Sequence, residues 1–214
     1  MQLIGMLDSP YVRRVAISLQ LLGLRFEHRN LSVFRTFGEF SKINPVVKAP
    51  TLVCDNGVTL MDSTLILDYV EALAEPARHL MPITLPERQQ ALHRLGLALV
   101  LCEKAVQIVY EHELRPEAKR HAPWLDRVTT QLHAACRVLD DEVGRHPFST
   151  EPGRIDQAGI TTAVAWHFLQ RMLPDAVAAA ACPALAAWSD HAESLPAFRH
   201  APHGEGLVTV VEAA

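Results

Sequence analysis

The chain has 214 residues, of which 49% are hydrophobic and 21% charged, a composition typical of a globular protein with room for one large domain or two small ones. Its formal net charge of −4 gives no general electrostatic reason to bind nucleic acid or an anionic membrane. It contains no apolar run near the roughly 20 residues of a membrane span, and no basic segment followed by an unbroken apolar stretch at its N-terminus. We therefore expect a cytoplasmic protein that binds neither nucleic acid nor membrane.

The first residues predict a strand, a helix and a second strand. Residues 2–6 form a short apolar run, and after it Ser9 is a good helix N-cap with Pro10 at the first helical position, which tolerates proline. Apolar residues then recur at helical spacing until Gly23, which is placed to end the helix. Residues 26–31 alternate as a strand. Two strands joined by a helix imply a parallel pair with a crossover connection.

A loop, a hairpin and a second helix follow. Residues 32–46 predict an irregular segment with at most a helical turn over 39–43. Residues 51–54 and 58–61 are short apolar runs separated by an Asp-Asn-Gly turn, and Asn-Gly is the strongest short-range hairpin signal. Residues 63–74 show the apolar spacing of a helix.

The composition changes after residue 75, where three prolines fall within residues 75–86 and strand signals cease. Predicted helices cover residues 86–113, 118–143, 156–172 and 184–193, with a short one near residue 196. We therefore predict a small mixed domain over 1–77, a linker over 78–86 and an all-helical domain over 87–214.

The cysteines and histidines predict neither a disulfide framework nor a metal site. His200 and His203 form the one close histidine pair, and Pro202 between them excludes a regular helical face. The cysteines are widely spaced with no C-x-x-C pair, so we expect buried or half-buried free thiols at Cys54, Cys102, Cys136 and Cys182.

Three short motifs stand where a helix or a strand begins. They are Ser9-Pro10-Tyr11-Val12-Arg13-Arg14, Val47-Lys48-Ala49-Pro50-Thr51-Leu52 and Asp62-Ser63. Each has a purely structural explanation, because serine and aspartate are ordinary N-caps and a proline before a strand is usually a trans turn residue. A helix N-terminus also favours a nearby anion by about 0.3–1 kcal/mol, so the first and third motifs suit an anionic ligand.

In this order the motifs resemble the glutathione-binding half of cytosolic glutathione S-transferases of the serine type, the tau-like and related bacterial groups. Segments 155–161, 182–188 and 195–198 extend the resemblance over nearly the whole chain. It implies a thioredoxin-like N-terminal α/β domain (βαβ then ββα, with a mixed sheet) followed by an all-α helical-bundle domain. It also implies glutathione as co-substrate, no covalently bound cofactor, and a homodimer in which a stripe on helix 62–74 meets the long helix of a second copy.

The resemblance makes Ser9 the catalytic residue. Its hydroxyl would donate a hydrogen bond to the glutathione sulfur and hold it as the thiolate. Lowering a thiol pKa from about 8.5 to about 6.5 requires roughly 2.7 kcal/mol, within reach of one charge-assisted hydrogen bond and a helix dipole. Glutaredoxins and omega-type transferases carry cysteine at this position, and serine cannot form a mixed disulfide, which excludes disulfide exchange through Ser9.

The other motifs supply the expected glutathione contacts. Pro50 should be cis, as in the thioredoxin-like fold, so that the Ala49 backbone pairs with the cysteinyl part of glutathione like an added strand. Ala49 stands where the family usually has valine or isoleucine, which matters little for a backbone contact. Lys48 is expected at the glycine carboxylate, and Arg35 is a weaker candidate for the same group.

The γ-glutamyl end of glutathione is expected at the third motif. Ser63 would offer its hydroxyl and backbone N–H to the α-carboxylate, and Asp62 would pair with the α-ammonium. In the helical half, Asp156 is expected to cap a helix, with Gly159 standing where the family has an aspartate. The reciprocal half of the capping box is then missing, which should cost stability rather than glutathione binding.

The electrophile and the reaction stay open. A small hydrophobic electrophile would bind between the first helix and the long helix of the second domain, with Gln107, Tyr110, Glu111 and Trp166 as candidate lining residues, although core packing also explains each. A glutathione-dependent isomerase of maleyl compounds, a peroxidase and a dehalogenase are alternatives. The isomerase branch usually carries a Ser-Ser-Cys run where Asp8-Ser9-Pro10 stands. A non-catalytic adaptor of this fold is the alternative from another class, and the presence of all the expected contact residues speaks against it.

Overall fold

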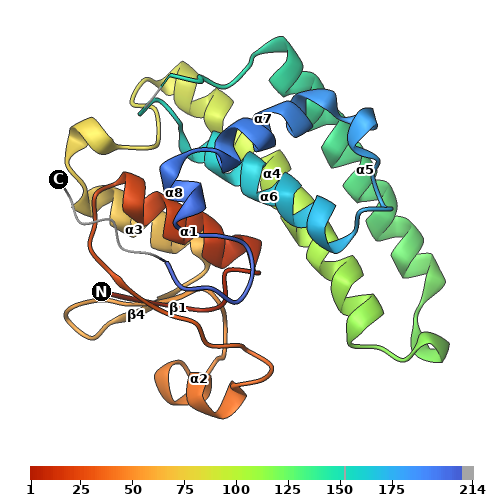
Figure 1. Cartoon of the computed structure of the whole chain (residues 1–214), viewed down its shortest axis with the longest axis horizontal. Helices are drawn as coiled ribbons and strands as arrows, with labels where there is room; N and C mark the ends of the chain where they lie inside the picture. Colours follow the sequence, from red (N-terminus) through yellow and green to blue (C-terminus); the bar gives the residue numbers. More distant parts are fainter. Residues whose placement is uncertain (152, 209–214) are drawn as a thin grey trace. The chain divides into compact units, whose positions relative to one another are not determined.

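The computed structural model describes residues 1–151 and 153–208 (Figure 1). It divides into two compact units, Met1–Met81 with the segment that begins at Ser194, and Pro82–Glu193. The expected domain boundaries at 77 and 87 stay predictions. The contacts add that residues 194–208 pack with the first unit.

The first unit is built on a four-stranded mixed sheet in the order β2-β1-β3-β4. β1 pairs parallel with β2 and antiparallel with β3, and β3 pairs antiparallel with β4. The predicted crossover pair and the Asn-Gly hairpin are confirmed, and with them the thioredoxin-like α/β domain. The strands are β1 (Gln2–Ile4), β2 (Glu27–Arg29), β3 (Thr51–Val53) and β4 (Thr59–Met61).

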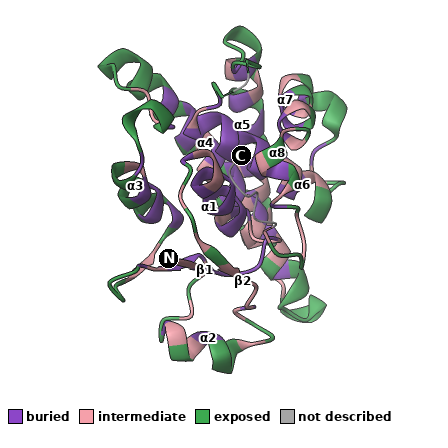
Figure 2. Cartoon of the chain, turned by 60° about the vertical axis from the view of Figure 1, so that its left-hand side comes forward, coloured by how far each residue is buried: buried purple, intermediate pink, exposed green. Residues whose placement is uncertain are grey.

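Helices α1 (Pro10–Leu21) and α3 (Ser63–Leu73) pack together on one side of the sheet, and α2 (Phe37–Ile43) lies on the other side (Figures 1 and 2). The helical turn expected over 39–43 is in fact this seven-residue helix. Its sequence gives little apolar periodicity because Phe40 is its one buried residue. After α3 comes a 3₁₀ turn, η1 (Pro76–Arg78).

α1 is the central helix of this unit and carries two adjacent arginines in its buried part (Figure 2). The Arg13 guanidinium donates from Nε to the carbonyl oxygen of Ala201 at 2.8 Å and from Nη2 to that of Phe198 at 3.4 Å. It thereby ties α8 (Pro196–Arg199) and the residues after it to α1. Arg14 points to α3 instead.

The second unit is helical, as predicted. Its elements are α4 (Leu85–Glu113), η2 (Glu117–Lys119), α5 (Ala122–Arg145), α6 (Gln157–Met172), η3 (Ala179–Ala181) and α7 (Pro183–Glu193). Helix α6 is buried along most of its length and packs against α4 and α7. Within the described ranges, no helix combines the length and the apolar character that a bilayer crossing requires.

The N-terminus of α6 explains the glycine at position 159. Asp156 caps the helix as predicted, its Oδ1 accepting a hydrogen bond from the Gly159 N–H at 2.7 Å. The Trp188 indole donates from Nε1 to the Gly159 carbonyl at 2.9 Å, and a Cβ on Gly159 would lie 3.0 Å from Trp188 Cζ2. A side chain at position 159 would therefore require the Trp188 ring to shift by a few tenths of an ångström.

All four cysteines are free and buried, as expected. Burial is the main cause that raises the pKa of Cys136 to about 12 and of Cys182 to about 11. These two thiols therefore stay protonated at neutral pH.

Candidate functional site

Ser9 stands in the turn between β1 and α1 and caps the helix. Its Oγ accepts a long hydrogen bond of 3.4 Å from the Val12 N–H, and its own N–H donates to the Met6 carbonyl at 3.2 Å. The side chain is half-buried. Because the cap uses only a lone pair of the hydroxyl oxygen, the hydroxyl proton is available for donation to a ligand.

The first two motifs lie side by side, and Gly5 marks where they meet. A Cβ on Gly5 would stand 2.6 Å from Val12 Cγ2 and 3.3 Å from Ala49 Cβ. Residue 5 has a φ of +140°, a conformation that glycine adopts without cost. The N-terminal turn of α1 and the Ala49–Pro50 bond therefore approach each other across the end of β1. That bond is cis, as expected.

The second and third motifs share an unusual backbone. Val47 with a φ of 51° and Asp62 with a φ of 67° are the non-glycine residues of positive φ in the described part of the chain. Such a conformation costs a non-glycine residue about 1–2 kcal/mol and is rarest for β-branched side chains. Strained residues of this kind cluster at functional sites. Their occurrence in two of the three motifs supports a ligand-binding role for both loops.

The third motif forms the N-terminus of α3. Asp62 is exposed and caps the helix with Oδ1, which accepts a hydrogen bond from the Thr64 N–H at 2.8 Å. Ser63 is 3% exposed, and its Oγ accepts a hydrogen bond from Nη1 of Arg14 at 3.1 Å. Arg14 is the last residue of the first motif, where the sequence assigned it no role of its own, and it is itself 0% exposed.

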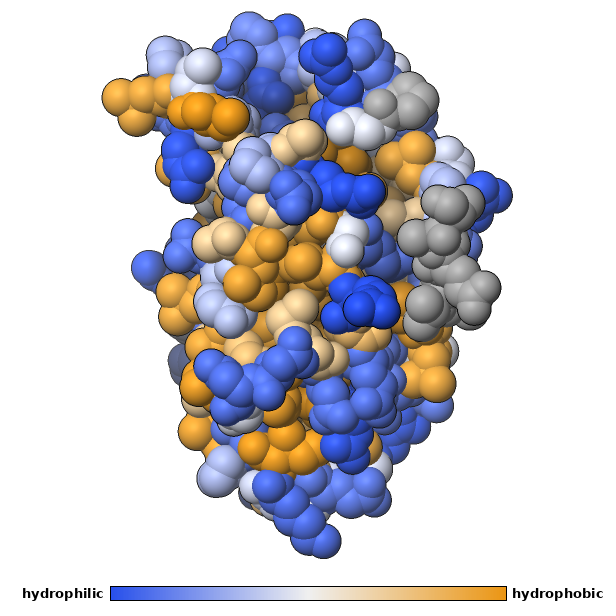
Figure 3. Space-filling view, turned by 90° about the vertical axis from the view of Figure 1, so that its left-hand side faces the viewer, coloured by the Kyte–Doolittle hydropathy of each residue, from blue (hydrophilic) through white to orange (hydrophobic). Residues whose placement is uncertain are grey.

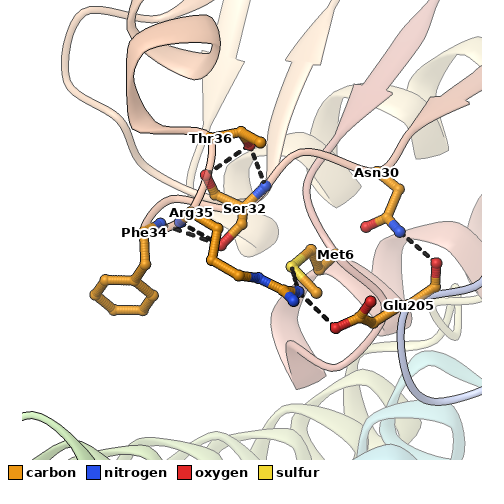
Figure 4. A network of polar contacts seen from close by, with 7 residues as sticks. All are labelled: Met6, Asn30, Ser32, Phe34, Arg35, Thr36 and Glu205. Carbon is orange, nitrogen blue, oxygen red and sulfur yellow. Dashed lines mark hydrogen bonds and ion pairs between the residues drawn. The ribbon is translucent and has the colours of Figure 1, made fainter.

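Arg35 is engaged by the C-terminal segment of the same chain (Figure 4). Its Nη2 lies 2.6 Å from Oε1 of Glu205 and 3.4 Å from Sδ of Met6. Asn30 donates a second hydrogen bond, from Nδ2 to the Glu205 backbone carbonyl. The expected partner of Arg35 was the glycine carboxylate of glutathione, and a carboxylate of the protein itself stands beside it here.

The loop that carries Arg35 is held by Ser32 (Figure 4). The Ser32 Oγ accepts hydrogen bonds from the N–H groups of Phe34 at 3.2 Å and Arg35 at 3.1 Å. The Ser32 N–H donates to Thr36 Oγ1 at 2.8 Å. Both long side chains of the ion pair are exposed, Arg35 at 61% and Glu205 at 69%. The backbone is therefore fixed locally, while the ion pair faces solvent.

Asp8 is a further charged group at this end of the site. Burial raises the pKa of its carboxyl above the usual 3.8, and Glu205 also raises it, while the Ser9 N–H and Arg35 act in the opposite direction. An acidic residue directly before the serine was the one sequence signal for it. The other predicted cation, Lys48, is exposed, and its backbone carbonyl accepts a hydrogen bond from Thr51 Oγ1 at 2.6 Å.

The four candidates for the electrophile pocket belong to the second unit. Tyr110 is 44% exposed, whereas Trp166 is 3% exposed and part of the core. Gln107 donates from Nε2 to Glu103 Oε1 at 3.0 Å. The Glu111 carboxylate is buried, accepting from the His121 N–H at 3.1 Å and lying 2.9 Å from Arg115 Nε. Glu111 thus joins the end of α4 to the segment before α5, and a role of these four residues in an electrophile pocket stays a prediction.

Comparison with known proteins agrees with this fold. Residues 3–78 match the family described as glutathione S-transferase, N-terminal domain. The chain is 26% identical over 174 residues to the uncharacterized GST-like protein YibF of Escherichia coli K12, covering 81% of this chain and 85% of YibF.

Two solved bacterial structures extend the likeness to the whole chain. A glutathione S-transferase of Methylobacterium radiotolerans in complex with glutathione sulfonate is 27% identical, with a TM-score of 0.84 over 100% of this chain and 98% of that one. A glutathione transferase family member of Pseudomonas fluorescens Pf-5 with bound glutathione is 29% identical, with a TM-score of 0.78 over 92% and 96%. Residues 3–78 therefore form a glutathione S-transferase N-terminal domain, and the chain as a whole has the fold of the glutathione S-transferases that it resembles.

Proposed function

We propose that the protein is a glutathione transferase of the serine type, in which Ser9 stabilises the glutathione thiolate. The observation that carries the proposal is the convergence on α1 of all three motifs. Gly5 brings Ala49 against the first turn of the helix, and Arg14 joins the helix to Ser63. The bound glutathione sulfonate and glutathione of the two bacterial relatives support the same ligand for this chain.

Glutathione would bind as an extended peptide along this arrangement. The Ala49 backbone pairs with the cysteinyl residue, and the sulfur then lies near the Ser9 hydroxyl at the N-terminus of α1. The γ-glutamyl α-carboxylate lies at Ser63 and the N-terminus of α3, with the α-ammonium at Asp62. Lys48 and Arg35 supply positive charge for the glycine carboxylate.

The chemistry follows from holding the sulfur as an anion. On binding, the thiol releases its proton to solvent, and the Ser9 hydroxyl and the α1 dipole stabilise the resulting thiolate. The thiolate attacks an electrophilic carbon of a small hydrophobic substrate, a carbon–sulfur bond forms, and the leaving group departs with its electron pair. The lowered thiol pKa and the proximity of the two reactants supply the acceleration.

The test is a pH titration of the ultraviolet thiolate absorbance of protein-bound glutathione, for the unaltered chain and for Ser9→Ala. We expect a thiol pKa about two units below the free value near 8.5, and loss of that shift in the variant. Ser41→Ala is the matched control, since that hydroxyl donates to the Gly38 carbonyl within α2. Saturable binding with an unshifted titration would contradict the role of Ser9. Absence of binding would contradict the transferase and favour the adaptor.

The proposal includes a homodimer. Leu65, Tyr69 and Leu73 lie on α3 at helical spacing and are exposed at 64%, 37% and 49%. Apolar side chains also gather in the middle of the face drawn in Figure 3. A stripe of this kind on α3 suits the long helix of a second copy. We expect the unaltered chain to sediment at the mass of two chains. The Leu65→Glu variant should sediment at the mass of one chain.

A further inference from the structure

We propose that residues 201–208 form a strap that competes with the glycine carboxylate of glutathione for Arg35, and that His28 is a latch that holds the strap closed and opens on protonation. This inference rests on the proposed function and adds a regulation of the same site by pH. The strap contacts the edge strand β2 through His28 and brings the Glu205 carboxylate to Arg35 (Figure 4).

The strap is anchored in the core at its first residue. Arg13, which is 1% exposed, donates a hydrogen bond to the Ala201 carbonyl oxygen at 2.8 Å. Residues further along lie at the surface, since Glu205 in its ion pair with Arg35 is 69% exposed and Leu207 is 57% exposed. The strap can therefore open beyond Ala201 while α8 stays in place on α1.

His28 holds the far end of the strap. Its Nδ1 accepts a hydrogen bond from the Val208 N–H at 3.2 Å, and its Nε2 lies 2.8 Å from the Gly5 carbonyl oxygen. An N–H group donates and a carbonyl oxygen accepts, so these two partners select the neutral ring with its proton on Nε2. Protonation of Nδ1 would place a proton against the Val208 N–H, and this hydrogen bond would be lost. The latch therefore works only with a neutral imidazole.

The surroundings of His28 favour the neutral ring. Burial lowers the pKa of His28 below its ordinary 6.5, and the hydrogen bond to the Gly5 carbonyl opposes this effect. Glu27 and Arg29 are its charged neighbours on β2, and the alternation of a strand directs their side chains to the other face of the sheet. The ring is therefore neutral in the closed strap at pH values well below those at which a free histidine would be.

The direction of the pH effect follows from this difference. With the strap open, the ring is released from burial and titrates nearer its ordinary value of 6.5. The open state therefore binds more protons, so the closed state loses stability relative to it as the pH falls below about 6.5. As the strap opens, Glu205 leaves Arg35, and this arginine becomes available to the glycine carboxylate.

Other groups around the strap also titrate and must be separated from His28. They are Asp8, whose carboxyl pKa is raised by burial and by Glu205 and lowered by Arg35, and His203 and Glu205 of the strap itself. Replacing Glu205 leaves Asp8 and His203 in place. A pH effect that comes from either of them therefore persists in Glu205→Gln, whereas an effect of the latch disappears.

The experiment measures the dissociation constant of S-methylglutathione by calorimetry at about pH 7.5 and about pH 5.5, on either side of the ordinary histidine pKa. The methylated sulfur carries no proton, so titration of the glutathione thiol does not contribute. The unaltered chain should bind this ligand about threefold more tightly at the lower pH, the scale of an exposed ion pair. The glycine monoethyl ester of the same ligand should show no such gain, because it lacks the carboxylate that Arg35 would bind.

Two variants should abolish the pH dependence. Glu205→Gln removes the competing carboxylate, and His28→Gln keeps a donor at the position of Nε2 but has no acceptor at the position of Nδ1 for the Val208 N–H. Both should bind S-methylglutathione at pH 7.5 about as tightly as the unaltered chain does at pH 5.5, in line with the roughly threefold gain above.

His133→Gln is the matched control. The Nε2 of His133 also lies 2.8 Å from a backbone carbonyl oxygen, that of Ala176 in the second unit. This variant should keep the full gain. Equal affinities of the unaltered chain at both pH values would overturn the latch and leave the transferase standing, and so would a gain that survives in Glu205→Gln. Absence of binding at both pH values would contradict the glutathione site, and with it the competition for Arg35.

A measurement on the unaltered chain covers the case in which His28→Gln does not fold. Nitrogen-15 NMR of the His28 ring should show the tautomer protonated on Nε2 at neutral pH. The Val208 amide resonance should then shift with the same midpoint as the ring when the pH is lowered. A Val208 amide that stays unchanged while His28 titrates would overturn the inference without any substitution.

Discussion

The two ends of the proposed glutathione site are built in opposite ways. At the γ-glutamyl end, Ser63 is buried, begins a helix of eleven residues and is held by an arginine from the centre of the core. At the glycine end, Arg35 stands on an exposed loop and is paired with Glu205 of the chain itself. A donor fixed by the core is ready before the ligand arrives, whereas a solvent-exposed cation with an intramolecular partner must exchange that partner for the ligand. Most of the binding free energy should therefore come from the γ-glutamyl end.

The largest expected effect is that of Ser63→Ala. It removes a hydroxyl that would donate to a carboxylate and leaves the Arg14 guanidinium facing a methyl group. We expect glutathione to bind about 30-fold more weakly, in line with the 1.5–3 kcal/mol of a hydrogen bond to a charged group. Isothermal calorimetry measures it, with Ser41→Ala as control. A loss below about threefold would remove the contrast between the two ends.

Asp62→Asn should have the next largest effect. Asparagine keeps an oxygen to cap α3 and tolerates the left-handed backbone at this position, so the free energy of unfolding should change little. The charge that would face the α-ammonium is lost, and glutathione should bind about fivefold more weakly. Thermal unfolding and calorimetry on the same sample separate the two effects. An unchanged affinity would confine Asp62 to the role of a cap.

Glu205→Gln tests the glycine end and should act in the opposite direction. Without the Glu205 carboxylate, Arg35 is released for the ligand, and glutathione should bind about threefold more tightly, the scale of an exposed ion pair. The gain should vanish for glutathione monoethyl ester, in which the glycine carboxylate is blocked, and should shrink at high salt. Tighter binding of both ligands alike would show that Glu205 does not compete with the glycine carboxylate.

The smallest expected effect is that of Asp8→Asn on the pH dependence of the free energy of unfolding. Burial raises the pKa of this carboxyl in the folded chain above its ordinary 3.8, so the folded state binds more protons than the unfolded state just above that value. The free energy of unfolding therefore falls as the pH rises through this window. Asp8→Asn should remove the fall and raise stability at neutral pH by about 0.5 kcal/mol, since the group is partly solvated. Urea unfolding between pH 3 and pH 7 measures the difference. Equal slopes for both chains would contradict the prediction.

The sequence predicted the features that depend on neighbouring residues. The Ser9 and Asp156 caps, the Asn-Gly hairpin and the crossover pair each arise from a few adjacent positions, and all are present. The sequence predicted only a helical turn where helix α2 lies, because α2 buries a single side chain and so shows no apolar periodicity.

Contacts between distant positions could not be predicted in the same way. Arg14 and Ser63 are 49 positions apart, and Trp188 lies 29 positions after Gly159, so no local pattern connects them. The sequence therefore indicated only that an aspartate is missing at position 159. In the structure, the Trp188 indole packs closely against Gly159 and donates a hydrogen bond to its carbonyl. The predicted contact of Arg35 with the glycine carboxylate of glutathione stays a prediction, and no spacing rule indicated that Glu205 of the same chain would lie beside Arg35.

Because Glu205 is tethered to the chain, its concentration at Arg35 does not fall when the protein is diluted. A group tethered within the same chain commonly experiences an effective concentration of the order of millimolar. Free glutathione must reach a comparable concentration before its glycine carboxylate displaces Glu205, whereas the γ-glutamyl end meets no such competitor in the described residues. The Arg35 end should then add to affinity chiefly where glutathione is abundant.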